Sequence, residues 1–572
     1  ADLEGALVSE LLPTLQAADV RKGLVDYLVT TFALADESAR ESLEAFLQHP
    51  ERGIFKGPYV RARVPFRSAV DGWRESLEWY EGFPPYGHQA SAFERLSSAN
   101  LSATKPAPLP TLVTTGTGSG KTEAFLNPIL DHVLRAKRDG QKGIKALILY
   151  PMNALANDQA RRIADTIKKY PELDGIRAAI YTGQKDKKRN DVTANGLIND
   201  RKSIRLDPPD ILLTNYKMLD QLLLRPKDQT LWQASAHSLQ YLVLDEFHTY
   251  DGAQGTDVAM LLRRLGLTLS RYGADVDPAA HGALGRVTPV ATSATLGDKG
   301  DPSRMIAFAN TVFGPVFDDT SVVTETRQSI REWSDGASDR LAARGLTPRP
   351  IDPTVVDRVN AAVANLGDDG RDADAITSAV LGALYRDASA DQDLPAAIDP
   401  HDKSLVLDLT KAHPLIHALI EAAADAVPLT ELADTILPRG LGATETYEQR
   451  ETARLAFIVS LLAALSHVRF RCELAAISID LHLWMRSLTR IDRLAAADVE
   501  FAWSDDGDLF GTDLAESPAP RFPAVYCRHC GRSGWGVELA PTGTSLDVDD
   551  ADIRRNHASR ANDRFRAVLF AA

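Results

Sequence analysis

The stretch that decides the fold of this chain is Thr115-Gly116-Thr117-Gly118-Ser119-Gly120-Lys121-Thr122, which follows the apolar run 111–113 and precedes a helical pattern from residue 123. The order of strand, glycine-rich turn and helix is typical of a loop that binds phosphate through backbone N–H groups and a helix N-terminus. Lys121 would neutralise the β- and γ-phosphates of a nucleotide, and the Thr122 hydroxyl would reach Mg²⁺. The candidate nucleotide contacts of the loop are Gly116, Gly118, Gly120, Lys121 and Thr122.

Length and composition limit the class of protein. A chain of 572 residues is expected to fold as three or four domains of roughly 150 residues each. The N-terminus lacks the pattern of a secretory signal, and no uncharged apolar stretch reaches about 18 residues, so we expect no membrane partner. Three cysteines exclude a disulfide scaffold and indicate a reducing, cytoplasmic setting. A net charge of −14 argues against coating of nucleic acid but leaves room for a local basic groove.

Apolar strands alternate with helical patterns after the phosphate loop. Residues 145–150, 178–181, 211–213 and 240–244 read as buried strands. This alternation predicts a parallel, doubly wound α/β sheet whose ligands lie beyond the carboxyl ends of the strands. Two such ends carry Thr, Gly and Asn, which can bind a phosphate backbone without reading bases, although capping or turn formation is their more common role.

A candidate adenine contact lies upstream of the loop, in Phe83-Pro84-Pro85-Tyr86-Gly87-His88-Gln89. The Gln89 amide can donate to and accept from the adenine edge at once, and an aromatic ring such as Tyr86 can stack on the base. Alone, Gln89 would be interpreted as a surface amide. Its position before a phosphate loop favours adenine recognition.

Two adjacent carboxylates, Asp245 and Glu246, follow the strand at 240–244, where burial is costly unless a cation uses their charge. Asp245 can hold the Mg²⁺ of a nucleotide, and Glu246 can orient or deprotonate an attacking water. His248 is placed to couple the nucleotide to the rest of the protein. The hydroxyls of 292–295 can link a γ-phosphate sensor to a bound strand. The basic run 185–205 predicts either a solvated loop or an electrostatic contact to a nucleic acid.

These motifs occur together in a recognisable order. Gln89, TGTGSGKT, YPMNALANDQ, YTGQ, LLTNYKML, DEFH and TSATLG resemble, in order and approximate spacing, the first motor lobe of superfamily 2 DExH helicases. Residues 76–315 are most similar to the Lhr-like and MrfA-like branch, which includes the large helicases of bacterial antiviral defence loci of the DISARM and Druantia kinds.

The resemblance implies a RecA-like P-loop NTPase domain that uses ATP and Mg²⁺. Its implied catalytic residues are Lys121, Asp245, Glu246 and His248, with coupling through Ser293 and Thr295. Its implied contacts to the nucleic-acid strand are Pro151, Asn153, Thr182, Gly183, Thr214 and Asn215. One departure stands out, because no Gln-x-x-Gly-Arg-x-x-Arg motif of a second RecA-like lobe follows Gly297. We therefore expect the second lobe in a longer protein or from a partner.

The remaining parts carry weaker signals. We expect a helical N-terminal region at 1–75, which is either a docking layer on the motor or a plain bundle, and a helical insertion at 316–465. A mixed α/β module at 466–572, expected to continue beyond the chain end, contains Cys527-Arg528-His529-Cys530. This pair is compatible with half of a zinc site completed by His467, His482, Cys472 or later residues, with a reduced structural turn, or with redox chemistry.

The sequence thus predicts an ATP-dependent helicase or translocase with DNA favoured over RNA as the substrate, acting in defence against phage or in DNA repair, with defence-system subunits as candidate partners. A nucleotide-gated scaffold that recruits partners to DNA without unwinding is the alternative. The retained Glu246 favours the enzyme, because a protein that only binds ATP has no use for that carboxylate.

Overall fold

The computed structural model divides into two compact units. The sheet unit comprises residues 66–327, and the flanking unit comprises residues 1–65 together with residues 328–572. The residues described are 13–50, 52–80, 84–99, 101–102, 105–116, 118–183, 188–194, 196–273, 284–294, 301–366, 372–387, 392–393, 398–437, 446–496, 498–504, 520–540, 542, 545–547, 553 and 564–570.

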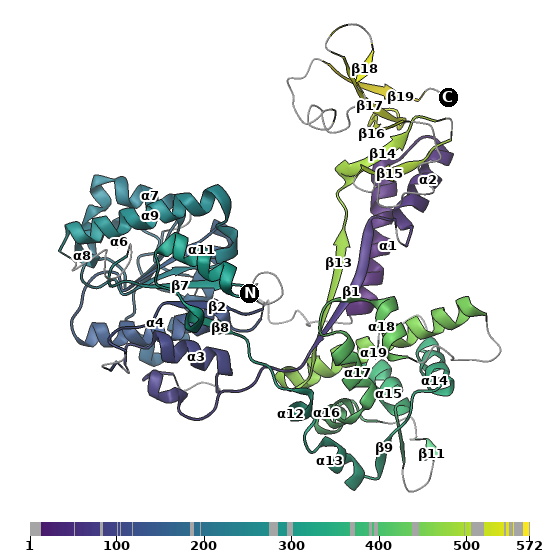
Figure 1. Cartoon of the computed structure of the whole chain (residues 1–572), viewed down its shortest axis with the longest axis horizontal. Helices are drawn as coiled ribbons and strands as arrows, with labels where there is room; N and C mark the ends of the chain where they lie inside the picture. The colour runs from purple at the N-terminus through teal and green to yellow at the C-terminus, as the bar shows by residue number, and fades with distance from the viewer. Residues whose placement is uncertain are drawn as a thin grey trace. The chain divides into compact units, whose positions relative to one another are not determined.

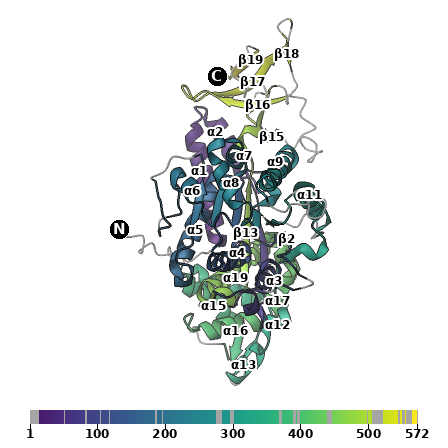
Figure 2. The same ribbon diagram turned by 90° about the vertical axis from the view of Figure 1, so that its left-hand side faces the viewer.

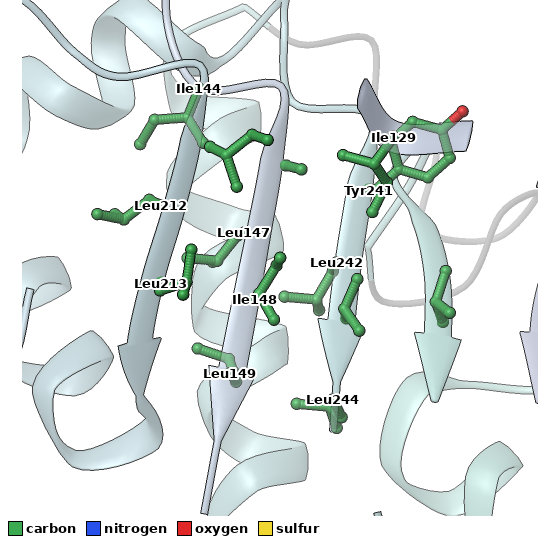
Figure 3. Packing of buried hydrophobic residues seen from close by; sticks show 14 of the residues in the cluster. Ile129, Ile144, Leu147, Ile148, Leu149, Leu212, Leu213, Tyr241, Leu242 and Leu244 are labelled. Atoms are coloured by element: carbon green, nitrogen blue, oxygen red, sulfur yellow. The ribbon is translucent and has the colours of Figure 1, made fainter. Parts of the chain in front are cut away.

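The sheet unit is built on a parallel sheet with the strand order β4-β5-β3-β6-β7-β2-β8. The strands are β2 Thr111–Thr114, β3 Ala146–Tyr150, β4 Ala178–Tyr181, β5 Ile211–Asn215, β6 Tyr241–Leu244, β7 Thr288–Ser293 and β8 Val322–Thr324. Every residue of β3 and β6 is buried, as expected where helices cover both faces of a parallel sheet. Figure 3 shows Leu213, Ile148 and Leu242 projecting from three neighbouring strands into this core.

Helices lie on both faces of the sheet, with α3 and α4 on one side and α7, α9 and α11 on the other (Figure 1). Their bounds are α3 Gly87–Leu96, α4 Lys121–Arg138, α5 Asn153–Lys169, α6 Arg201–Leu206, α7 Tyr216–Leu224, α8 Gln229–Ser235, α9 Gly252–Arg271 and α11 Ser303–Phe313. Short 3₁₀ helices are η1 Trp73–Ser76, η2 Pro171–Leu173, η3 Pro226–Asp228, η4 Phe247–Thr249 and η6 Asp319–Ser321. The predicted doubly wound α/β fold is confirmed.

Strand β8 was not predicted from the sequence. It lies past residue 315, where the sequence analysis ended the first lobe, and it pairs in parallel with β2 through Leu112–Val322 and Thr114–Thr324. Three residues at the edge of a sheet give too short a pattern to distinguish from a loop. The strand matters because Glu325, the third residue after Val322, reaches the phosphate loop.

The flanking unit contains a helical core around α19, which runs from Tyr447 to Cys472. Phe457, Ile458 and Leu461 of this helix are fully buried. Residues 449–475 are long and apolar enough to cross a membrane by length and composition alone, yet they pack as the centre of a protein core. The other elements are α12 Ile330–Ser334, α13 Ala337–Ala343, α14 Pro353–Ala364, α15 Ala373–Ala383, α16 Lys403–Ala412, α17 Pro414–Ala422, α18 Leu429–Ile436, β9 Leu346–Pro348, β10 Tyr385–Asp387 and β11 Gln392–Asp393.

The N-terminal region differs from the expected helical segment 1–75. Helices α1 Pro13–Phe32 and α2 Glu37–Gln48 are present, but β1 Phe55–Arg63 follows them and pairs with β12 Val427–Pro428 and β13 Ser478–Met485. Val60 and Ala62 alternate with solvent-facing residues, a period of two that the glycine and proline in Phe55-Lys56-Gly57-Pro58 obscure. This region therefore folds with the last third of the chain.

The end of the flanking unit is a sheet of short strands. These are β14 Ile491–Leu494, β15 Phe501–Trp503, β16 Arg521–Tyr526, β17 Ser533–Leu539, β18 Leu546–Asp547 and β19 Phe565–Leu569. After α19, most described residues lie in strands or in the 3₁₀ helices η8 Glu473–Ala475 and η9 Leu488–Arg490, and the described residue Ile553 is helical. Helix α2 lies beside β15 (Figures 1 and 2), where the Ser42 hydroxyl donates to the Val499 carbonyl at 2.6 Å.

Candidate nucleotide and nucleic-acid site

The phosphate loop connects β2 to α4 through two glycines in the left-handed region. Gly118 has φ 77° and Gly120 has φ 78°, conformations that cost other residues energy. Helix α4 begins at Lys121, and among the described residues no side chain caps its first turn. The N–H groups of that turn are therefore not occupied by a described capping side chain, which suits an anion at the positive end of the helix.

Three side chains hold the backbone of the phosphate loop. The Nε2 atom of His88 lies 2.8 Å from the Ser119 carbonyl, and the Gln89 amide donates to the Gly120 carbonyl at 3.2 Å. From β8, the Glu325 carboxylate accepts the Gly116 N–H at 2.9 Å. Sequence reasoning missed His88 and Glu325; only the position of His88 beside Gln89 could have suggested it.

Gln89 has partners inside the protein at both ends of its amide. Besides donating to Gly120, it accepts the Tyr86 N–H at 2.9 Å and so caps α3. The amide keeps one donor hydrogen and one lone pair, enough for the donor and acceptor contact to adenine that the sequence suggests. The Tyr86 ring packs against Phe66 at 4.8 Å and His88 at 5.6 Å between centroids, so a base would meet a cluster of rings.

The acidic pair follows β6 directly. Asp245 is 5% exposed and accepts from the Thr292 hydroxyl of β7 and the Glu246 N–H. Burial raises the pKa of the Asp245 carboxyl, while the Thr292 hydrogen bond opposes the rise. Glu246 has φ 51°, an unusual conformation for a residue with a side chain, and such conformations are concentrated at functional sites. A divalent cation would compensate the cost of burying the Asp245 charge.

The loop and the acidic pair meet in space. The Lys121 ammonium lies 3.4 Å from the Glu246 carboxylate, and both side chains are partly shielded from solvent. The Thr122 hydroxyl donates to Gln159 of α5 at 3.4 Å. A Cβ placed on Gly118 would meet no described atom within 4 Å, so the crest of the loop is open. An open loop, an ammonium and a buried carboxylate fit the triphosphate and Mg²⁺ of a bound nucleotide.

His248 and Ser293 join the acidic pair to the neighbouring strand. The Nδ1 atom of His248 lies 3.6 Å from the Glu246 carboxylate and 3.3 Å from the Ser293 hydroxyl. The Ser293 carbonyl in turn accepts the Thr115 N–H at 3.2 Å. A continuous set of contacts thus runs from the phosphate loop to His248. Thr295 lies outside the described residues.

The residues proposed to contact a strand lie at the carboxyl ends of β3, β4 and β5. Asn215 caps α7 by accepting the Met218 N–H at 2.8 Å and donates to Asn153 at 2.6 Å. Thr214 is fully buried, and its hydroxyl donates to the Tyr181 carbonyl at 2.7 Å. The Thr182 carbonyl accepts from Arg201 at 3.1 Å. Thr214 therefore supports the strand ends from inside, whereas Gly183 is exposed and Pro151 and Asn153 are partly exposed.

The basic run 185–205 makes mostly internal contacts where it is described. Arg189 donates to the Leu197 carbonyl at 3.1 Å, Arg205 to Asp228 at 2.5 Å, and Lys188 lies 3.3 Å from Asp200. Residues 184–187 lie outside the described residues. These contacts favour a role for Arg189 and Arg205 in holding the protein's own fold over a contact to nucleic acid.

The Cys527–Cys530 turn is built against the N-terminal helices. Gly531, at φ 69°, accepts the Ala35 N–H at 2.9 Å, and backbone N–H groups of the turn lower the pKa of the Cys527 thiol. Among the described residues, no group of three or more His, Cys, Asp or Glu side chains could hold a metal. His467 instead lies 2.8 Å from Asp374, and the Cys472 thiol donates to the Lys403 carbonyl. His467 and Cys472 thus have partners elsewhere in the unit, and the described residues do not support a zinc site at the cysteine turn.

Comparison with known proteins identifies the sheet unit. The family model of the DEAD/DEAH box helicase matches residues 87–300. These residues form a DEAD/DEAH box helicase domain. The domain contains the phosphate loop, the acidic pair and β7, so the predicted helicase resemblance is confirmed.

Individual relatives match shorter parts of the chain. The Druantia protein DruE of Escherichia coli is 25% identical over 43% of this chain and 19% of its own length. The uncharacterised ATP-dependent helicases MJ1574 of Methanocaldococcus jannaschii and YprA of Bacillus subtilis are each 30% identical over 33% of this chain, covering 24% and 21% of their own lengths. The crystal structure of the DUF1998 helicase MrfA bound to DNA aligns with 47% of this chain and 31% of that chain, at 25% identity and a TM-score of 0.31. The chain thus spans about a fifth to a quarter of these curated relatives.

Proposed function

We propose that this chain is the nucleotide-driven part of an ATP-dependent helicase or translocase that acts on nucleic acid, with DNA favoured. The observation that carries the proposal is the convergence of Lys121, Asp245 and Glu246 at the carboxyl end of one parallel sheet. A scaffold that only binds ATP needs Lys121 but has no use for a second carboxylate held in a left-handed conformation.

Each residue of the site has a proposed role in ATP hydrolysis. Asp245 and Thr122 would hold Mg²⁺, which when bound neutralises charge on the phosphates. Lys121 would exchange its Glu246 partner for those phosphates, and this exchange would release the Glu246 carboxylate to orient a water and take its proton. His248 contacts both Glu246 and Ser293, so a change at Glu246 when nucleotide binds would be transmitted through His248 to β7.

The similar proteins also support a proposal for the biological setting of this chain. The similarity to a Druantia protein supports bacterial defence as the biological setting, with DNA repair as the second candidate. A second RecA-like lobe, in a longer protein or from a partner, would complete the site. We propose the cytoplasm as the compartment, because all three cysteines are free thiols.

The test is steady-state ATP hydrolysis by this chain and by Glu246→Gln, with and without single-stranded DNA. Loss of a general base predicts a fall of about 10²- to 10⁴-fold in turnover, with ATP binding retained. Glu123→Gln is the matched control, because Glu123 makes a surface ion pair with Arg162 at 2.5 Å near the same loop. Binding of ATP without turnover, even with a second lobe supplied, would contradict the helicase proposal and leave the scaffold.

A further inference from the structure

The β1–β13 ribbon of the flanking unit has two different faces. Val60 and Ala62 of β1 are buried in the helical core, and Ile479 and Leu481 of β13 pack against the same core. Side chains alternate along a strand, so the residues between these positions point to the opposite face. Figure 1 shows the two strands running side by side with α1 alongside.

The register of the ribbon defines the composition of its outer face. Lys56 lies opposite Trp484, Tyr59 opposite His482, and Arg61 opposite Asp480. Directly opposed residues of an antiparallel pair share a face. Arg63 lies opposite Ser478 on the same face. We call this set the ribbon face; it comprises Lys56, Tyr59, Arg61, Arg63, Ser478, Asp480, His482 and Trp484.

Solvent reaches the aromatic members of the ribbon face. The Trp484 side chain is 67% exposed, His482 and Lys56 are exposed, and Tyr59 and Arg61 are partly exposed. A large apolar ring left exposed lacks the stabilisation that its burial would give. An exposed Trp on a regular strand therefore indicates a surface that binds a ligand or partner.

The charges of the ribbon face are mainly positive. Arg63 is paired with the Asp480 carboxylate at 2.5 Å, which neutralises one cation. Lys56 and Arg61 add two further positive charges, and Arg61 is oriented by a hydrogen bond from Nε to the Ala424 carbonyl at 3.1 Å. A local positive surface on a chain of net charge −14 attracts polyanions to this place in particular.

Aromatic and cationic residues alternate along the ribbon in a pattern suited to one class of ligand. Trp484 and His482 are two positions apart on β13, about 7 Å along the strand, and Tyr59 lies across from His482. Binding sites for single-stranded nucleic acid combine rings on which successive bases stack with cations that follow the phosphates. An apolar protein interface would instead deplete Lys from such a patch.

We propose that the ribbon face binds single-stranded nucleic acid, with bases stacked on Trp484 and Tyr59 and phosphates held by Lys56 and Arg61. This surface lies outside residues 87–300, in the flanking unit, and would bind nucleic acid separately from the helicase domain. The inference rests on the proposed function, which supplies the class of substrate.

The test is fluorescence anisotropy of labelled dT20 and rU20 with the full chain, without nucleotide, over a series of salt concentrations. Trp484→Ala is expected to weaken binding by about 5- to 150-fold, as for loss of one stacked base, and Trp484→Phe is expected to restore much of it. Lys56→Ala is expected to lower the slope of log affinity against log salt by about 0.7. Leu474→Ala is the control, because Leu474 is 58% exposed in the same unit but lies off the ribbon.

The outcomes separate this inference from the proposed function. If the unaltered chain binds neither oligonucleotide, the proposed substrate class fails. If it binds both but Trp484→Ala and Lys56→Ala bind equally well, the ribbon face serves something else, such as a protein partner, and this inference is overturned. Photochemical cross-linking of a bromodeoxyuridine oligonucleotide to the unaltered chain gives an independent check, with cross-links expected in the peptides that carry Trp484 or Tyr59.

Discussion

Alanine at Gly118 and alanine at Gly120 form a matched pair that tests how the phosphate loop is held. Both glycines have nearly the same φ, 77° and 78°. A Cβ on Gly118 would meet no described atom within 4 Å, whereas a Cβ on Gly120 would overlap the Nε2 atom of Gln89 and lie 3.4 Å from Glu123. The two substitutions therefore share the backbone strain and differ in the displacement of Gln89.

The magnitudes follow from these contacts. A side chain in the left-handed region costs roughly 1–2 kcal/mol in either variant. Gly120→Ala also breaks the 3.2 Å hydrogen bond from Gln89 to the Gly120 carbonyl and disturbs the 2.9 Å bond from the Tyr86 N–H. At about 0.5–1.5 kcal/mol for each bond, Gly120→Ala should be less stable than Gly118→Ala by about 1–3 kcal/mol.

The assay is urea unfolding of the nucleotide-free chain, and the quantity measured is the free energy of unfolding of the sheet unit. Four variants are compared. Gly118→Ala and Gly120→Ala are each measured with Gln89 and with Gln89→Ala. The difference between the two glycine variants should vanish when Gln89 is absent, because its hydrogen bonds are then already lost. Equal stabilities in the presence of Gln89, or a difference that persists without it, would refute the claim that Gln89 holds the loop.

Three further outcomes are expected. Lys145→Met should destabilise the sheet unit by about 1.5–3 kcal/mol, because the buried Asp210 carboxylate loses its 2.7 Å ion pair with Lys145 but keeps Lys137 at 3.0 Å and the Arg177 N–H at 2.8 Å; urea unfolding measures this, and a loss below about 1 kcal/mol would contradict it. Burial lowers the pKa of His132 from 6.5 to about 4, so the unfolded chain binds a proton that the folded chain rejects, and the free energy of unfolding should fall by about 3 kcal/mol as the pH drops from 6.5 to 4. His132→Gln should remove that part of the acid sensitivity, and an unchanged pH profile would show that other groups cause it. The purified chain should contain less than one zinc per molecule by elemental analysis, because two thiolates supply half of a tetrahedral site; stoichiometric zinc would point to ligands from the undescribed residues.

Much of the sheet unit could be predicted because its signals are local. The glycine loop and the apolar strands that end in Asp245 or Asn215 each fit within a few residues, and strand–helix alternation fixes a parallel sheet. Contacts between distant residues were not predictable. Nothing near Glu325 in the sequence indicates that its carboxylate accepts the Gly116 N–H, since that contact depends on β8 pairing with β2.

The same reasoning explains why the surroundings of Thr214 and of the cysteine turn could not be predicted. Thr214 has the residue type expected at a strand end, but it is fully buried, and its hydroxyl donates to the Tyr181 carbonyl. The cysteine turn has the spacing of a metal knuckle, yet spacing along the chain does not show which residues surround it in space. In the flanking unit, β1 could not be recognised because its partner strand lies in the last third of the chain.

The pairing of β1 with β13 also bears on biosynthesis. Roughly 400 residues separate Arg63 from Ser478, which lie opposite each other in the ribbon. At about 5–20 residues per second, a ribosome needs on the order of 20–80 s to supply the second strand after the first. During that interval the local contacts of the sheet unit can form, while the edge of Phe55–Arg63 that pairs with β13 has no partner strand yet. The N-terminal strand is therefore the segment of the nascent chain with most to gain from a chaperone that covers exposed strands.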